Sequence, residues 1–253
     1  MSLWQFIDGR ESAERALALV NRAQPEQLHS MLTGAFERQP VPVREDIVEA
    51  YPEDTVLLLD GEQNVIAESP LDAVANSLLF TNSDAYITGS TSLEESELPD
   101  VLAGLDDVLF RLRGYPASHK EKLLLICVSR HIERIAWHND SGTLRSSFQR
   151  LSRISDEVGT ERVYRQLSGS GADVHVYGMG DSGTVPDDLD VTVHTGQNED
   201  YRDSWFVVHC PASADDEPIA LLAIQDETGI WDGFFTTDRE EVRAIDSYVA
   251  ERL

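Results

Sequence analysis

The sequence predicts an α/β fold, with α+β as its variant, built on a mixed central β-sheet flanked by helices. Three observations lead to this fold class. Short apolar runs bounded by turn residues recur along the chain and predict strands. Helical patterns are interleaved with these runs, and the longest predicts a central helix near residues 118–138. The 253 residues, 41% of them hydrophobic, can bury a core without disulfides or metals.

The first half of the chain alternates strand and helix signals. Pro25 suits the first turn of a helix, and residues 60–62 (DGE) predict a hairpin turn between two apolar strands. Residues 81–99 form the longest candidate loop, a length that is typical of functional loops. In order, we expect a strand at 16–20, a helix at 25–38, strands at 56–59 and 65–67, a helix at 71–80, a short helix at 100–105 and a strand at 108–113.

The second half opens with the long helix, whose start at Ser118 has a capping box completed by Glu121. Residues 143–158 predict another helix, because Phe148, Leu151 and Ile154 share one helical face. A third helix is expected at 161–167. Five strands are expected at 174–177, 191–194, 205–210, 219–224 and 231–236, and an amphipathic helix at 239–253 closes the chain.

The charge of the chain is strongly negative. Forty-six acids face 20 Lys and Arg, which gives a net charge of −26, and only two residues are Lys. Such a surface repels itself in dilute buffer, but molar salt screens the repulsion within about 3 Å. The composition is therefore typical of a protein from a halophilic archaeon. Without a basic patch, direct nucleic-acid binding is disfavoured. The chain has no run of 18 apolar residues and no signal peptide, which predicts a cytoplasmic protein without membrane segments.

Three patterns match known functional motifs, but the residues around each of them argue against that function. The glycines Gly178, Gly180 and Gly183 match a dinucleotide fingerprint, but the following residues cannot open the helix that would hold a pyrophosphate. Asp60 ends an apolar strand, as a phospho-accepting aspartate would, yet it leads directly into a hairpin. Cys127, His131 and His138 share one side of the long helix and could ligate zinc, but a site needs further ligands. We expect no metal, no cofactor and no catalytic residue.

Two clusters combine aromatic rings with hydrogen-bonding side chains, which is the usual composition of a small-molecule pocket. One lies at residues 82–89 and the other at 231–238. The alternative is that Trp231 and Phe235 belong to the core and that Asp238 caps the last helix. The predicted ligand-binding residues are Asn82, Asp84, Tyr86, Lys120, Phe148, Trp231 and Phe235.

Several segments resemble the DICT sensory domain in their order and spacing. They are residues 118–122 (SHKEK), 130–133 (RHIE), 147–153 (SFQRLSR), 162–167 (RVYRQL), 174–177 (VHVY), 204–208 (SWFVV) and 231–238 (WDGFFTTD). Residues 20–22 and 79–84 resemble the stand-alone haloarchaeal members. The resemblance implies a sensor that serves signalling outputs such as histidine kinases or cyclic-di-GMP enzymes, and it implies no ligand and no binding residue.

We therefore expect one sensory domain over residues 1–253, with an N-terminal α/β part (1–113), the best family match (118–238) and a C-terminal helix (239–253). It would bind a small molecule or a partner without chemistry and pass its state to a separate kinase or regulator. The signal would travel through an exposed surface or a change of oligomer, such as a homodimer. The alternatives are an adaptor that uses the 81–99 loop, and a metal-dependent hydrolase built on Cys127, His131 and His138.

Overall fold

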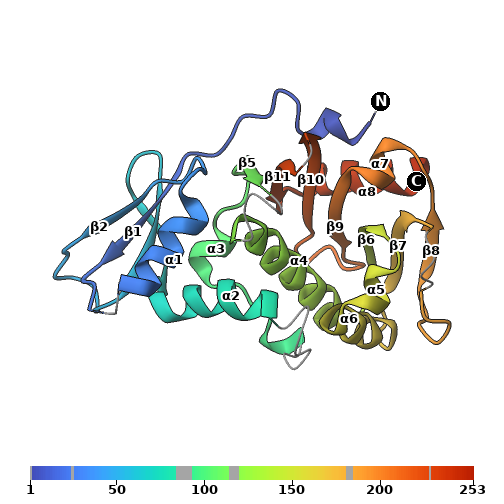
Figure 1. Cartoon of the computed structure of the whole chain (residues 1–253), viewed down its shortest axis with the longest axis horizontal. Helices are drawn as coiled ribbons and strands as arrows, with labels where there is room; N and C mark the ends of the chain where they lie inside the picture. The colour runs from blue at the N-terminus through green and yellow to red at the C-terminus, as the bar shows by residue number, and fades with distance from the viewer. Residues whose placement is uncertain (1, 24–25, 84–92, 114–119, 181–184, 228) are drawn as a thin grey trace.

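The computed structural model describes residues 2–23, 26–83, 93–113, 120–180, 185–227 and 229–253. Helices and strands are mixed throughout, which confirms the predicted class, but the strands form two mixed sheets flanked by helices where the sequence suggested one. The two sheets lie toward opposite ends of the long axis of the molecule (Figure 1).

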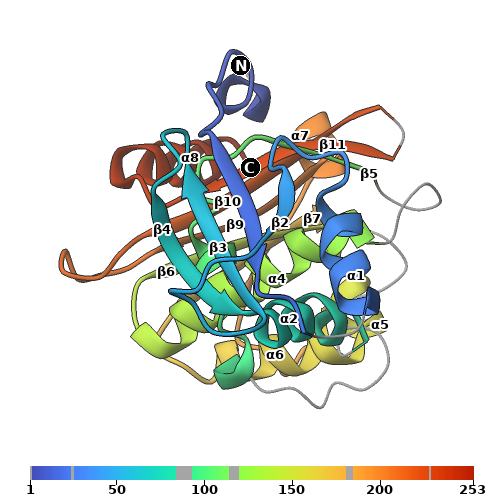
Figure 2. The ribbon, with the colours of Figure 1, turned by 90° about the vertical axis from the view of Figure 1, so that its left-hand side faces the viewer.

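The smaller sheet has the strand order β2 (Val43–Asp46), β1 (Arg15–Val20), β3 (Thr55–Asp60) and β4 (Val65–Pro70); Figure 2 faces it. Strand β1 runs parallel to β2 and antiparallel to β3, and β3 and β4 form the predicted hairpin. Asp60 accepts hydrogen bonds from the Asn64 side chain and from the N–H groups of Asn64 and Glu62, and these lower its pKa. Asp60 is therefore a turn residue. Strand β2 was not predicted, because its residues VRED are mostly exposed.

The larger sheet has seven strands, and its order differs from the chain order. From edge to edge the strands are β5 (Phe110–Arg113), β11 (Ile230–Thr236), β10 (Ile219–Glu227), β9 (Ser204–Cys210), β6 (Thr143–Arg150), β7 (Asp173–Met179) and β8 (Thr192–Thr195). Along this order each strand from β5 to β6 is antiparallel to the next, whereas β7 is parallel to both β6 and β8.

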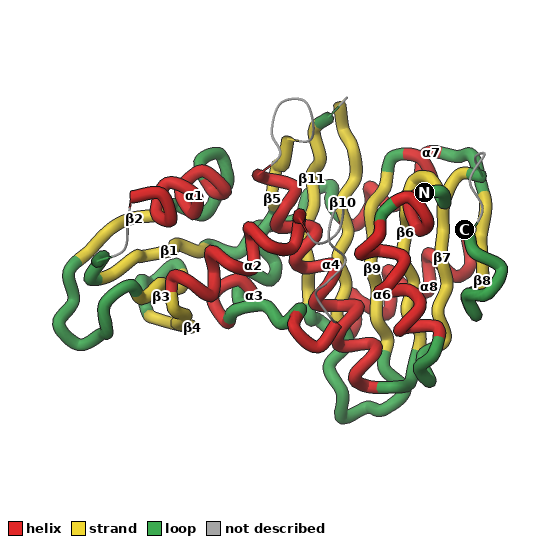
Figure 3. The backbone as a smooth tube through the Cα atoms, turned by 60° about the horizontal axis from the view of Figure 1, so that its bottom comes forward, coloured by secondary structure: helices red, strands yellow, loops and turns green. Residues whose placement is uncertain are grey.

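Helices cover both faces of the larger sheet. The long helix α4 (Lys120–Asn139), α5 (Arg153–Asp156) and α6 (Val158–Ser168) pack on one face. Helix α8 (Arg239–Arg252), the short helix α7 (Glu199–Arg202) and the 3₁₀ helix η1 (Leu3–Phe6) cover the other. Helices α1 (Glu26–Phe36) and α2 (Leu71–Ser83) pack between the smaller sheet and α4 (Figure 3). The short α3 (Asp100–Ala103) packs on β3 and β4, and the 3₁₀ helix η3 (Leu93–Glu95) packs on α4.

Helix α4 is the element that joins the two sheets into one core. Its residues Leu124, Val128, Ile132 and Ala136 are at most 4% exposed and form a buried apolar stripe, and Ile135 beside them is half-buried. One continuous apolar cluster extends through α4 from strands β1 and β3 to strands β9 and β10. Burying each large aliphatic side chain of this kind contributes about 1.5–3 kcal/mol. The position of α4 is therefore strongly determined, and the side chains it presents are held rigidly.

The helix predicted for residues 143–158 is wrong. Residues 143–150 form β6, which lies between β7 and β9 in the larger sheet, and only Arg153–Asp156 is helical. Both neighbours supply backbone hydrogen bonds to β6, and Leu144 and Ser146 are buried while Arg145 is half-buried. Phe148, Leu151 and Ile154 do meet the core, but from a strand end, a turn and a short helix. The tertiary neighbours of β6, which a local pattern cannot show, decided its conformation.

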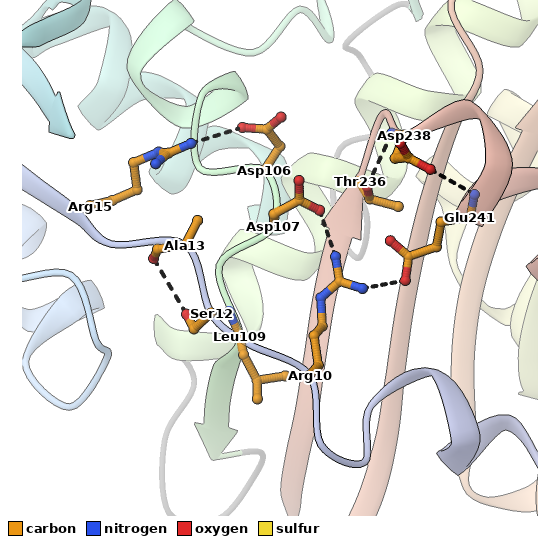
Figure 4. A network of polar contacts seen from close by, with 10 residues as sticks. All are labelled: Arg10, Ser12, Ala13, Arg15, Asp106, Asp107, Leu109, Thr236, Asp238 and Glu241. Atoms are coloured by element: carbon orange, nitrogen blue, oxygen red, sulfur yellow. Dashed lines mark hydrogen bonds and ion pairs between the residues drawn. The ribbon is translucent and has the colours of Figure 1, made fainter. Parts of the chain in front are cut away.

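An N-terminal strap, residues 7–14, leads from η1 back to β1, and polar contacts attach it to the larger sheet (Figure 4). The Arg10 guanidinium binds Asp107 at 2.6 Å and also binds Glu241 of α8. It lies 3.6 Å from the ring centroid of Phe234. Arg15 adds an ion pair to Asp106 at 3.8 Å. These contacts connect the first residues of the chain to two distant segments.

The other predicted helices and strands lie within a few residues of their expected bounds, whereas the short helices η1, η3 and α7 were not predicted. Asp238 caps α8, as one reading of the sequence expected, by accepting a hydrogen bond from the N–H of Glu241 at 2.8 Å. Gly178 lies inside β7, and Gly183 lies outside the described residues. The next described helix begins only at Glu199, well beyond the glycine motif. In the described part of the chain, no helix is both long and apolar enough to span a bilayer.

Candidate functional site

A pocket opens between helix α4, strand β6 and the α5–α6 segment, with the side chain of Trp205 from β9 as a further wall. Its volume is about 60 Å³. Because roughly 10–15 Å³ of such volume holds one water molecule, the pocket has space for about four to six water-sized groups. The polar lining residues are Ser129, Arg130, Glu133, Ser146, Ser147, Gln149, Arg153, Glu157, Thr160 and Tyr164.

A buried ion pair forms the floor of the pocket. The Arg130 guanidinium donates to Glu133 Oε2 at 2.6 Å, and the Tyr164 hydroxyl donates to Glu133 Oε1 at 3.0 Å. Arg130 and Glu133 are one helical turn apart on α4, with side chains only 12% and 4% exposed. Burial is the largest single influence on the pKa of Arg130 and lowers it, but the charge and hydrogen bond of Glu133, with the nearby Tyr164 and Glu157, together outweigh burial, so the net pKa is raised. Burial and the same carboxylate hold the pKa of Tyr164 well above its usual value.

The network continues from this ion pair to the start of α6. Arg130 Nη2 donates to Thr160 Oγ1 at 2.7 Å, and the Thr160 hydroxyl donates to Glu157 Oε2 at 2.9 Å. Glu157 is the N-cap residue of α6, where a negative charge interacts favourably with the helix dipole. Charge-assisted hydrogen bonds of this kind are short and directional. They tie the position of α6 to the charge pair on α4.

A β-bulge shapes the side of the pocket that β6 contributes. The register between β6 and β7 shifts between Ser147 and Arg150, and Gln149 has a φ of 55°. Such bulges re-aim side chains and are common beside functional sites. The ring of Phe148 meets that of Tyr164 edge-on at 5.1 Å. Ser147 Oγ accepts from the N–H of Phe206 at 2.7 Å, which fixes the strand on its inner side.

Trp205 forms the second aromatic wall. Its indole N–H donates to Ser129 Oγ at 3.1 Å, and its ring lies edge-on to Trp231 at 6.4 Å. Phe148 and Trp205 thus present fixed aromatic surfaces, and hydrogen-bonding groups lie between them. Arg130, Glu133 and Tyr164 already satisfy one another, and both Arg130 and Tyr164 hold their protons tightly. This arrangement is suited to binding a molecule rather than to transferring protons.

Residues from four of the seven segments that carry the sequence resemblance meet in this pocket. Arg130 and Glu133 come from one of the resembling segments, Phe148 and Arg153 from a second, and Tyr164 and Trp205 from two more, over a span of 75 residues. The comparison with family models agrees. Residues 100–222 match the DICT family. This family is described as a sensory domain in diguanylate cyclases and two-component systems. Every lining residue of the pocket, from Ile126 to Val207, lies within the DICT match.

The DICT match begins at α3 and ends inside β10, so it spans α4, β6, α6 and β9, the elements around the pocket. No curated protein matched the chain in sequence. The matched family is a sensory one, and the pocket lies wholly within the matched segment.

A second cavity of about 460 Å³ lies on the opposite side of α4, against α3 and the ends of β10 and β11. Its volume is within the usual range for small-molecule pockets. His131 lines it, and the His131 Nδ1 accepts from the N–H of Leu98 at 3.2 Å. Burial and the nearby Arg134 charge lower the pKa of His131 to about 4, so the imidazole is neutral at pH 7.

The predicted ligand-binding residues are not brought together at one place. Phe148 lines the first pocket, Phe235 lines the second cavity, and Trp231 lies behind Trp205 in the core. Asn82 lies in α2 and Lys120 begins α4. Asp84 and Tyr86 lie outside the described residues, as does most of the 81–99 loop, and so do the side chains of Asn82 and Lys120.

The three residues of the hypothetical metal site have different surroundings. Cys127 is buried, with its Sγ 2.9 Å from the carbonyl oxygen of Ser77. His131 faces the second cavity, and His138 is exposed near the end of α4. Among the described residues, no three His, Cys, Asp or Glu side chains are grouped so that they could hold a metal ion.

Sequence reasoning missed most of the pocket. Arg130, Glu133, Thr160, Tyr164 and Trp205 were not proposed as site residues, although four of them stand in the segments that resemble DICT. The signal that could have identified them is that each of those resembling segments contains polar or aromatic side chains. Their convergence depends on the strand order of the larger sheet, which the sequence does not show.

Proposed function

We propose that this chain is a non-enzymatic sensory protein whose signal is a small molecule bound in the pocket between α4, β6 and the α5–α6 segment. The observation that carries this proposal is the convergence of the DICT-like segments on that pocket. The satisfied Arg130–Glu133 network supports a binding role, because a rigid, pre-formed floor reduces the entropy lost on binding.

The α5–α6 segment is the part of the pocket that we propose to carry the signal outward. Glu157 faces the pocket, whereas its neighbour Val158 is 51% exposed. A ligand that contacts Glu157 would bias the position of the start of α6, and with it the surface around Val158. A separate output protein, such as a histidine kinase or another regulator, would read that surface. A ligand shifts such an equilibrium only by its difference in affinity for the two states.

The proposed setting is a cytoplasm with molar salt. The net charge of −26 and the presence of only two Lys support it, because salt screens the repulsion between the acids. Binding assays should therefore include molar KCl.

The test is a thermal-shift screen of a metabolite library against the full chain and against Ser146→Val, which narrows the pocket from its buried wall. Ser155→Val, at an exposed position of α5, is the control. A ligand at a hundred times its dissociation constant should stabilise the protein by about 2.7 kcal/mol. We expect compounds that stabilise the wild type and Ser155→Val but not Ser146→Val. Compounds that stabilise all three proteins equally would show that the pocket is not the site.

A further inference from the structure

Two oppositely charged side chains line the pocket but form no ion pair with each other. Arg153 and Glu157 are four residues apart, both line the pocket and both are half-buried. No ion pair within the described part of the chain joins them or involves Arg153. The Glu157 carboxylate accepts from Thr160 through Oε2, which leaves further acceptor capacity. A half-buried cation and a half-buried anion thus face the same space.

A third polar group lies deeper. Ser146 is 1% exposed, and its hydroxyl acts on that of Tyr164 in the direction that lowers the Tyr164 pKa, but no hydrogen bond of good geometry joins Ser146 Oγ to a described residue. The Ser146 hydroxyl therefore keeps hydrogen-bonding capacity for a polar molecule in the pocket. The 60 Å³ volume limits that molecule to a few non-hydrogen atoms.

We infer that the pocket binds a small zwitterion of the free α-amino acid class, held between Arg153, Glu157 and Ser146. This inference rests on the proposed ligand pocket. The carboxylate of the ligand would accept hydrogen bonds from Arg153, and its ammonium would donate to Glu157. The aromatic walls favour an ammonium group near their faces.

The two charges at the site favour a zwitterion over an ion of either sign. Molar salt screens the long-range field of the net charge of −26, so selection falls to the groups that touch the ligand. A zwitterion matches both charges of the site. Selection of this kind depends on both groups, so a molecule that carries only one of them should bind more weakly.

The experiment measures the binding of glycine, acetate and methylammonium to the full chain by NMR chemical-shift perturbation, followed by a panel of larger α-amino acids. Acetate and methylammonium are the two halves of glycine. We expect glycine or another small amino acid to bind at least about tenfold more tightly than either half, since a charge-assisted hydrogen bond is worth that factor or more. Arg153→Gln and Glu157→Gln should each weaken binding by at least about tenfold.

The matched controls are Arg150→Gln and Asp156→Asn, which remove exposed charges of the same sign beside the pocket. They should leave the affinity within about twofold. If singly charged or uncharged molecules bind in the pocket as tightly as amino acids, the zwitterion inference is wrong while the proposed ligand pocket stands. If the full metabolite library yields no compound that depends on Ser146, the pocket itself is not a ligand site, and both proposals fail.

Discussion

Replacing Glu133 by Gln removes the negative charge beneath the pocket and leaves the Arg130 guanidinium buried without a counter-charge. The two side chains are 4% and 12% exposed and are 2.6 Å apart, so the remaining charge is largely shielded from bulk water. Breaking a buried ion pair in this way costs about 3–5 kcal/mol. For a protein of this size, that corresponds to a fall in melting temperature of about 6–20 °C.

The assay is equilibrium unfolding in urea at pH 7 and constant salt, followed by circular dichroism. Glu97→Gln is the control, because Glu97 is 69% exposed and its ion pair with Arg134, at 3.3 Å, should contribute less than about 1 kcal/mol. The double variant Arg130→Met with Glu133→Leu should recover part of the loss, since it removes the uncompensated charge. A Glu133→Gln protein within about 1 kcal/mol of the wild type would refute the idea that a desolvated charge pair organises this site.

Three further predictions concern the rest of the molecule. Arg10→Gln should free the N-terminal strap and speed amide exchange at residues 3–14, at a cost of about 1–3 kcal/mol; unchanged exchange would contradict the role of the contacts in Figure 4. Gly142→Ala should destabilise by at least about 2 kcal/mol in urea unfolding, because Gly142 has a φ of +82° and a Cβ would lie 2.3 Å from the carbonyl oxygen of Cys210. His131 is neutral in the fold, with its pKa lowered to about 4 by burial and Arg134. The unfolded chain, with a pKa near 6.5, binds more protons in this window, so stability should fall as the pH drops from about 6.5 to about 4, by up to about 3 kcal/mol. His131→Gln should lack this part of the pH profile, whereas the exposed His138→Gln should keep it; identical profiles would refute the assignment.

Local sequence signals predicted those elements whose structure is decided by nearby residues. The β3–β4 hairpin follows from the turn chemistry of Asp60, and the start of α8 follows from its cap, Asp238. Helix α4 was predicted because apolar residues recur at helical spacing over about three turns, from Leu124 to Ala136. In each case, the groups that make the deciding hydrogen bonds or contacts lie within one element or one turn of each other.

Of the predicted ligand-binding residues, only Phe148 lines this pocket, and the sequence placed it on a helix where the structure has strand β6. A strand is stabilised by its neighbours, and β7 and β9 lie 30 and 60 residues further along the chain from β6. One pocket is lined by Arg130, Glu133, Tyr164 and Trp205 only because β6 and β9 are adjacent in the sheet and α4 and α6 pack over them.

The sequence by itself determined the mixture of helices and strands, the acidic surface and the resemblance to a sensory family, because composition and short-range periodicity are properties of the chain before it folds. The tertiary structure decided that there are two sheets, that residues 143–150 are a strand, and that Arg153 and Glu157 face one small pocket without pairing. Those outcomes depend on which distant segments become neighbours. Burial and long-range backbone pairing select these neighbours, and no local pattern encodes them.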